Sequence, residues 1–138
     1  MVFKYALKNA FSQTIKALYI DESDNLHLLG EDDKEEKVIR INTDKVKEIL
    51  EKYEDVYKSV YKEDLPVAGV LDGYVNEFSF QVNNHKYKES ICNLCYFNDE
   101  QIDNSKHLTT IIDLLDELYD ELLKQNKIIE EYFIIAQE

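Results

Sequence analysis

The stretch VKEILEKYEDVYKSVY, residues 46–61, decides the fold. Its apolar residues recur at steps of three and four, and at about 100° per residue they occupy an arc of roughly 140° on a helix. The opposite side carries Lys, Glu and Asp. The side-chain oxygen of Asn42 or Thr43, just before it, can cap the free N–H groups of the first turn. The pattern predicts one long amphipathic helix with an apolar stripe of Val46, Ile49, Leu50, Tyr53, Val56, Tyr57, Val60 and Tyr61.

Three strands are expected before this helix. Residues 11–20, FSQTIKALYI, are rich in β-branched and aromatic residues, and the turn-forming cluster at 21–25 follows them. Residues 26–29 are predicted to form a short second strand and residues 37–41 a third. The charged segment 30–36 between them is predicted to be a loop.

The second half of the chain repeats the order of strands and then a helix. It begins at residue 67, and Asp72-Gly73 is a strong turn signal. Residues 74–82 alternate between apolar and polar side chains, which predicts a half-buried antiparallel strand. Asn83-Asn84 favours a tight turn, so residues 85–91 are expected to return beside that strand.

A second long helix is expected after an irregular segment at 92–102. Asp103, Asn104 or Ser105 can cap it. Beyond it, the tail IIEEYFII at 128–135 fits either a helical continuation or a short strand, and the helical phase slightly favours the continuation. The apolar stripe of this second helix consists of Leu108, Ile111, Ile112, Leu115, Leu118, Tyr119 and Leu122.

These elements predict the α+β class, with an antiparallel sheet, two long amphipathic helices packed on one face, and the order βββα-ββα. The length of 138 residues and the hydrophobic content of 44% suit one domain, so we expect residues 1–138 to form a single α+β domain.

The charge balance excludes several classes of function. The chain has 29 acidic residues against 16 Lys and Arg, a formal charge of −13. Direct binding of nucleic acid needs clustered positive charge and is not expected. No apolar run is long enough to span a membrane, and the N-terminus is too polar for a secretory signal. Two Cys do not form a disulfide framework, so a cytoplasmic location is expected.

The sequence contains no catalytic motif. It has no nucleophile elbow, no phosphate-binding loop and no dinucleotide fingerprint, so we expect a non-enzymatic protein without a cofactor or metal. The pair Cys92 and Cys95 leaves one alternative open, a small zinc-binding protein that uses His85 and His107 as its other ligands.

The acidic residues are concentrated in two segments. Residues 21–36 and residues 99–121 each contain eight acidic residues and one Lys, a formal charge of −7. Such segments either keep a protein soluble or form a surface for a basic partner. The candidate partner-binding acids are Glu31, Asp32 and Asp33 in the first segment and Asp113, Asp116, Glu117, Asp120 and Glu121 in the second.

Aromatic residues supply the rest of the candidate interface. Tyr57 and Tyr61 lie four residues apart on the first helix, and Tyr132 and Phe133 lie in the tail. Tyr is favoured at interfaces because it buries a large area and keeps a polar tip, but the same spacing suits a core stripe equally well.

The sequence therefore predicts an acidic binding protein, by analogy of profile with anti-CRISPR and toxin-immunity proteins. It would be an inhibitor or immunity-type protein that docks on the basic nucleic-acid-binding surface of a nuclease or defence enzyme. The alternatives are a structural homodimer that uses the C-terminal segment, residues 128–138, and the zinc-binding protein described above.

Overall fold

The fold is built on a six-stranded antiparallel sheet with the strand order β4-β3-β2-β1-β5-β6. The computed structural model describes residues 1–66, 73–92 and 97–134. The N-terminal strand β1 lies in the interior of the sheet, because it pairs with β2 on one side and with β5 on the other. The strands are β1 Phe3–Lys8, β2 Thr14–Ile20, β3 Asn25–Leu29, β4 Glu35–Arg40, β5 Val75–Val82 and β6 His85–Cys92.

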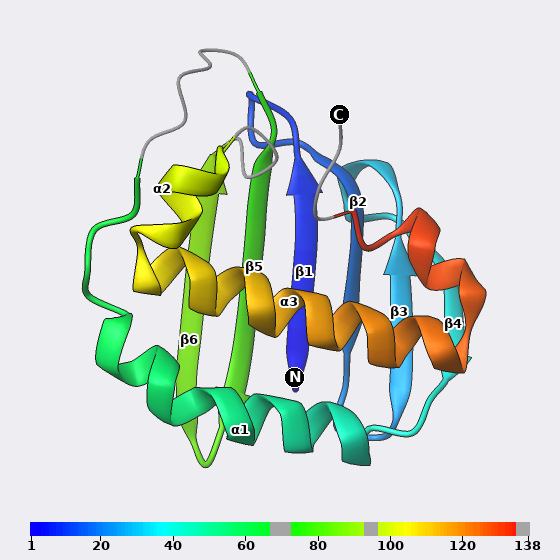
Figure 1. Ribbon diagram of the computed structural model, residues 1–138. Coiled ribbons are helices and arrows are strands. Elements are labelled where there is room, and N and C mark those ends of the chain that lie inside the picture. The colour runs from blue at the N-terminus through cyan, green and yellow to red at the C-terminus, as the bar shows by residue number, and fades with distance from the viewer. Residues whose placement is uncertain (67–72, 93–96, 135–138) are drawn as a thin grey trace.

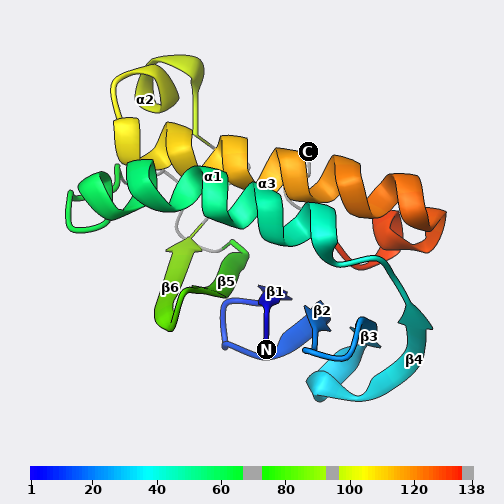
Figure 2. The same cartoon turned by 90° about the horizontal axis from the view of Figure 1, so that it is seen from below.

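Two long helices, α1 (Asp44–Val60) and α3 (Lys106–Gln125), lie side by side on one face of the sheet and run across its strands (Figures 1 and 2). The short helix α2 (Asp99–Asp103) precedes α3. The 3-10 turn η3 (Lys127–Glu131) follows α3 at the end of the sheet that holds β4 (Figure 1). No described helix covers the other face, which we call the open face (Figure 2).

The core lies between the sheet and the two helices. The register places Phe3 between Ile20 and Phe80, so apolar side chains of three neighbouring strands meet on the covered face. Leu118 and Leu122 of α3 are fully buried against this layer. Burial of these stripes stabilises the helices more than their intrinsic propensity does.

The α+β class is confirmed, as is the packing of both amphipathic helices on one face. The predicted order of elements was incomplete, because β1 at Phe3–Lys8 was missed and the first half has four strands. The segment at 11–20 forms a strand only from Thr14, because Asn9 accepts hydrogen bonds from the N–H groups of Phe11 and Gln13 and closes a turn there.

Two further expectations were wrong. The segment at 92–102 is not irregular throughout, because Asn98 and Gln101 form a capping box that starts α2. The tail is neither an α-helical continuation nor a strand. Asn126 accepts a hydrogen bond from the N–H of Ile128, which ends α3 and starts the 3-10 turn η3.

Several helix caps and one hairpin turn form at the residues that the sequence analysis predicted for them. Ser105 caps α3 by accepting from the N–H of Leu108. Asn42 accepts from the N–H of Asp44 at the start of α1. Asn83 and Asn84 both have positive φ, 48° and 68°, as a two-residue turn of type I′ requires. The expected turn at Asp72-Gly73 extends outside the described residues, as does the start of the second segment at residue 67.

Candidate functional site

The solvent face of α3 carries a row of exposed carboxylates, Asp113, Asp116 and Asp120, which we call the α3 acidic row. The residues lie three and four positions apart, so their side chains share one side of the helix, about 5 to 6 Å from one another. Their exposure follows from the fold, because the opposite stripe of α3 is buried against the sheet.

The α3 acidic row has no counter-charge of its own. Within the described part of the chain, no Lys, Arg or His lies within 4.0 Å of any of its carboxylates. Partial burial raises the pKa of Asp116 above its usual value, and the negative charges of Asp120 and Asp113 raise it further. The row is therefore a site of unrelieved like-charge repulsion, which a positively charged surface would remove.

The two glutamates among the candidate residues of α3 are engaged within the chain. Glu117 accepts hydrogen bonds from Lys52 of α1 at 3.0 and 3.1 Å. Glu121 accepts from the side-chain amide of Gln125 at 2.9 Å and lies 3.6 Å from Lys124. Glu117 thus links α3 to α1, whereas Glu121 is bonded within α3, and both contribute less free negative charge than the α3 acidic row.

The other predicted acids, Glu31, Asp32 and Asp33, form the exposed 3-10 turn η1 (Glu31–Asp33) between β3 and β4. Asp33 accepts a hydrogen bond from the hydroxyl of Thr14 at 2.8 Å, which fastens the turn to β2. This turn stands at an end of the strands, whereas α3 crosses the middle of the covered face (Figure 1). The structure thus separates the two acidic segments into different surfaces.

Most of the predicted aromatic contacts lie in the core. Tyr57, Tyr132 and Phe133 are 0%, 7% and 1% exposed, which leaves them no surface with which to meet a partner. Phe133 stacks on Tyr5 with ring centroids 4.6 Å apart, and the hydroxyl of Tyr132 donates to Glu36 at 2.6 Å. These aromatic side chains therefore belong to the core, which is the second of the two alternatives that their spacing allowed.

The remaining candidate, Tyr61, is half-buried and packs against the core. Its hydroxyl donates to the backbone carbonyl of Lys88 on β6 at 3.4 Å, so it links the end of α1 to the edge of the sheet. Tyr61 therefore reaches the surface beside β6. In Figure 1, β6 forms the edge of the sheet opposite the one near which α3 ends.

The buried side chains of Glu54 and His107 both have partners on β6. His107 at the start of α3 bridges the carbonyl of Glu63 through Nδ1 at 2.7 Å and the carboxylate of Glu89 through Nε2 at 2.6 Å. Glu54 of α1 accepts from the hydroxyl of Tyr87 at 3.1 Å, and burial together with this carboxylate raises the pKa of Tyr87 to about 12. These contacts fasten both helices to the sheet.

The structure does not assemble the four ligands of the zinc alternative among the residues it describes. His85 lies against Glu54 at 3.3 Å, whereas His107 is turned toward Glu89. Cys92 is exposed, and Cys95 lies outside the described residues. Within the described ranges, no group of three or more His, Cys, Asp or Glu is placed to hold a metal ion.

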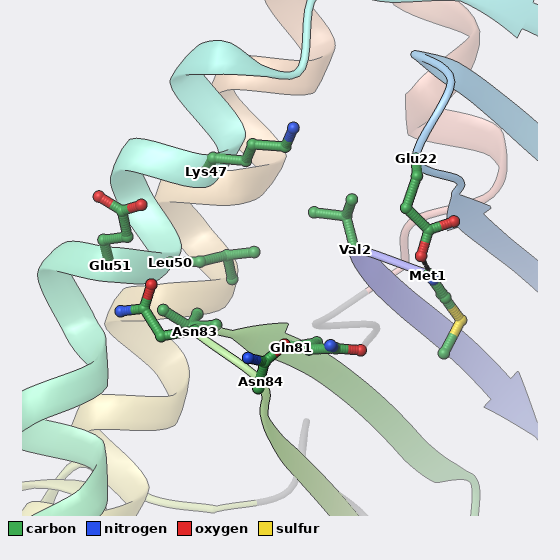
Figure 3. A pocket seen from close by; sticks show the side chains of 10 residues that line it. Met1, Val2, Glu22, Lys47, Leu50, Glu51, Gln81, Asn83 and Asn84 are labelled. Atoms are coloured by element: carbon green, nitrogen blue, oxygen red, sulfur yellow. Dashed lines mark hydrogen bonds and ion pairs between the residues drawn. The ribbon is translucent and has the colours of Figure 1, made fainter.

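A polar hollow of about 260 Å³ lies between α1, the N-terminus and the β5–β6 hairpin (Figure 3). Lys47 and Glu51 extend from α1, and Glu22 lies across from them with its carboxylate bonded to the amino group of Met1. The lining contains no His, Cys, Ser, Thr or Tyr, so it presents no hydroxyl, thiol or imidazole for nucleophilic catalysis.

The structure also exposes residues that the sequence analysis did not single out. Phe11, at the tip of the β1–β2 turn, is 86% exposed, and Val38 on the edge strand β4 is 44% exposed. On the open face, His27 stacks on Tyr19 with ring centroids 4.2 Å apart and contacts the carboxylates of Asp21 and Glu35. The side chains around His27 meet because of the way the strands pair, which the sequence alone does not determine.

The chain matches no protein-family model, and no curated protein matches it either. Among the described residues there is no helix that is both long enough and apolar enough to cross a membrane.

Proposed function

We propose that this chain is a non-enzymatic acidic binding protein, an inhibitor or immunity-type protein that docks on a basic nucleic-acid-binding surface of a nuclease or defence enzyme. The observation that carries the proposal is the α3 acidic row, because its carboxylates are exposed and no cation of the described residues pairs with them. A basic groove would supply the cations that this helix face lacks.

The shape of the helix face supports the same partner. Asp113, Asp116 and Asp120 stand on a rigid helix whose buried stripe fixes it to the sheet, so their carboxylates keep their spacing when a partner approaches. A row of negative charges on a rigid rod presents cations with an arrangement similar to one strand of a nucleic acid. Long-range attraction would speed the encounter and would weaken as salt is added.

The proposal is tested with a matched pair of variants. The first neutralises the α3 acidic row with Asp113→Asn, Asp116→Asn and Asp120→Asn. The control neutralises three exposed acids of α1 with Glu48→Gln, Glu51→Gln and Asp55→Asn, so both variants change the net charge by the same amount. Circular dichroism and thermal melting confirm that each variant remains folded.

Each tagged protein is used to capture partners from a lysate of the source or host strain, with washes of rising salt and mass spectrometry of the retained proteins. We expect the wild type and the α1 variant to retain the same basic nucleic-acid-binding protein, the α3 variant to lose it, and added DNA or RNA to displace it. Equal capture by the α1 and α3 variants would overturn the proposal, as would a partner that nucleic acid does not displace.

A further inference from the structure

A second hollow, of about 300 Å³, lies over the ladder between β5 and β6 on the open face of the sheet, and we call it the open-face hollow. The register sets Ser79 of β5 opposite Lys88 of β6. Gln81 and Lys86 form the next such pair on the same face. The intervening Phe80 is buried in the core beneath the helices, and side chains alternate along a strand, so these four point to the open face (Figure 2).

The open face is positively charged over β1, β5 and β6, although the chain as a whole carries a formal charge of −13. Glu89 of β6 does not contribute, because it is bonded to His107 on the covered face. Lys4 lies opposite Ser79, so it borders the open-face hollow on the side of β1. These three strands direct four lysines and one glutamate to the open face, a formal charge of +3: Lys4, Lys8, Lys86, Lys88 and Glu77.

The two hollows of the molecule differ in the charge of their lining. The hollow beside α1 contains Glu22 and Glu51 together with Lys47, so opposite charges offset each other there. The open-face hollow is lined by Lys86 and Lys88 and by no acidic residue. An anion therefore meets two cations and no carboxylate in this lining, whereas a cation would be repelled. The lining favours a negatively charged ligand.

The lining also supplies several hydrogen-bond donors. Within the described part of the chain, no carboxylate lies within 4.0 Å of Lys86, and the one nearest Lys88 is that of Glu77 at 3.8 Å. Each ammonium group has three N–H donors, and the hydroxyl of Ser79 and the amide of Gln81 add neutral ones. Lys86 and Lys88 stand about 7 Å apart along β6, so their long side chains can converge on one anion. A phosphate group, with two charges and several acceptor oxygens, uses such a set of donors more fully than a carboxylate does.

We infer that the open-face hollow binds the phosphate group of a small ligand, with Lys86 and Lys88 as the cations and Ser79 and Gln81 as neutral donors. Its volume of about 300 Å³ lies at the lower end of the range for ligand sites, so it suits a phosphate that carries a small organic group. The site is independent of the proposed function, because the α3 acidic row belongs to a helix on the covered face, on the other side of the sheet (Figure 2).

Titrations of the full chain with inorganic phosphate, adenosine monophosphate and adenosine, followed through backbone amide chemical shifts, test the inference. We expect the phosphate-bearing probes to give saturable shifts at Ser79, Lys86 and Lys88. Tighter binding of adenosine monophosphate than of phosphate would assign a nucleotide, and equal binding would assign the phosphate group alone. The absence of saturable shifts with both phosphate-bearing probes would overturn the inference, as would adenosine binding as tightly as its monophosphate.

A matched pair of variants locates the site. Lys86→Gln with Lys88→Gln removes both cations and should raise the dissociation constant of the tighter phosphate-bearing probe by about tenfold or more. The control, Lys45→Gln with Lys58→Gln, removes two exposed lysines of α1 and changes the net charge equally, so binding should be nearly unchanged. Circular dichroism confirms that each variant is folded. Equal weakening in the two variants would show that only the net charge matters and would overturn the inference.

A third variant should bind the same probe more tightly than the wild type. Glu77 lies 3.3 Å from Lys8 and 3.8 Å from Lys88, so its carboxylate competes with a bound anion for Lys88. Glu77→Gln removes this competitor and should lower the dissociation constant. Asp55→Asn on α1 changes the net charge equally and should lower it less. A Glu77→Gln protein that binds no more tightly than Asp55→Asn would also overturn the inference.

Discussion

The solvent faces of α1 and α3 both carry exposed acidic residues, but only those of α1 alternate with lysines. Lys45 lies 3.5 Å from Glu48 on α1, and Lys52 reaches across to Glu117 of α3. On α3, Lys106 and Lys124 stand near the two ends of the helix, and no Lys or Arg lies between them along the helix, where the α3 acidic row stands. Solubility alone requires only net charge, which a mixed surface also supplies. The difference therefore favours the solvent face of α3 as the surface that would bind a basic partner.

The difference is sharper because the buried imidazole of the same helix has a hydrogen-bond partner at each ring nitrogen. His107 in the first turn of α3 is 2% exposed and contacts both Glu63 and Glu89. An uncompensated charge costs several kcal/mol in the interior but little at the surface. The fold therefore pairs charges where they are buried and leaves carboxylates unpaired where a second molecule can reach them.

The largest expected effect tests the buried side of this comparison. His107→Leu leaves the carboxylate of Glu89 without its closest partner and should lower the free energy of unfolding by about 3 kcal/mol. Urea denaturation measures the loss. The double variant His107→Leu with Glu89→Leu removes both groups and should recover part of it. A loss below about 1 kcal/mol in the single variant would show that this contact does not fasten α3 to the sheet.

The second prediction concerns His27 on the open face. Burial alone would lower the pKa of His27, but its hydrogen bonds with the carboxylates of Asp21 and Glu35 outweigh burial and raise the pKa above 6.5. The folded state therefore binds this proton more tightly than the unfolded chain does. The stabilisation is fully present below pH 6.5 and is lost as the pH rises through the folded-state pKa.

Thermal melting between pH 6 and pH 9 should show this loss in the wild type, and His27→Gln should show a smaller one. Parallel melting curves for the two proteins across that range would contradict the assignment. The hydrogen bond from His27 also lowers the pKa of Asp21 to about 2, so a separate loss of stability should appear only as the pH falls from about 4 toward 2.

The sequence predicts those elements of this molecule whose pattern lies within a few neighbouring residues. The 3.6-residue periodicity located α1 and α3, and the alternation of Phe78, Phe80 and Val82 located β5. The strand β1 was missed because Tyr5, Ala6 and Leu7 are all buried, which removes the alternation that marks a half-exposed strand.

For the site, the sequence indicated which acids share the outer side of the second long helix, because their spacing is fixed by helical geometry. It could not show that Glu117 and Glu121 are engaged, since Lys52 is distant in sequence from Glu117. Nor could the sequence show whether Tyr57 lies in the core or at an interface, because core and surface stripes have the same spacing. Pairing across elements needs the tertiary arrangement.

A smaller effect is expected on the stability of variants in α3 and α1. Neutralising Asp113, Asp116 and Asp120 to Asn removes like-charge repulsion and should raise the free energy of unfolding by a few tenths of a kcal/mol. Neutralising Glu48, which lies against Lys45, should lower it by a similar amount. Denaturation at low ionic strength measures both changes. Equal signs for the two variants would remove the contrast between the helices.

The smallest effect is the titration of Asp116 itself. Burial and the charges of Asp120 and Asp113 raise its pKa, so this carboxyl should take up its proton at a higher pH than an ordinary Asp. In the double variant Asp113→Asn with Asp120→Asn, the pKa should fall toward the usual range, leaving only the effect of burial. An NMR pH titration of the Asp116 side chain measures both values, and an unchanged pKa would show that the carboxylates of the α3 acidic row do not interact.

The central claim is that the α3 acidic row occupies a surface that otherwise binds nucleic acid. The most direct measurement is a binding titration of the purified partner with this chain, repeated at several salt concentrations and in the presence of saturating nucleic acid. We predict that affinity falls steadily as salt rises and that nucleic acid and this chain exclude each other from the partner. A ternary complex of unchanged affinity, or binding insensitive to salt, would contradict the account.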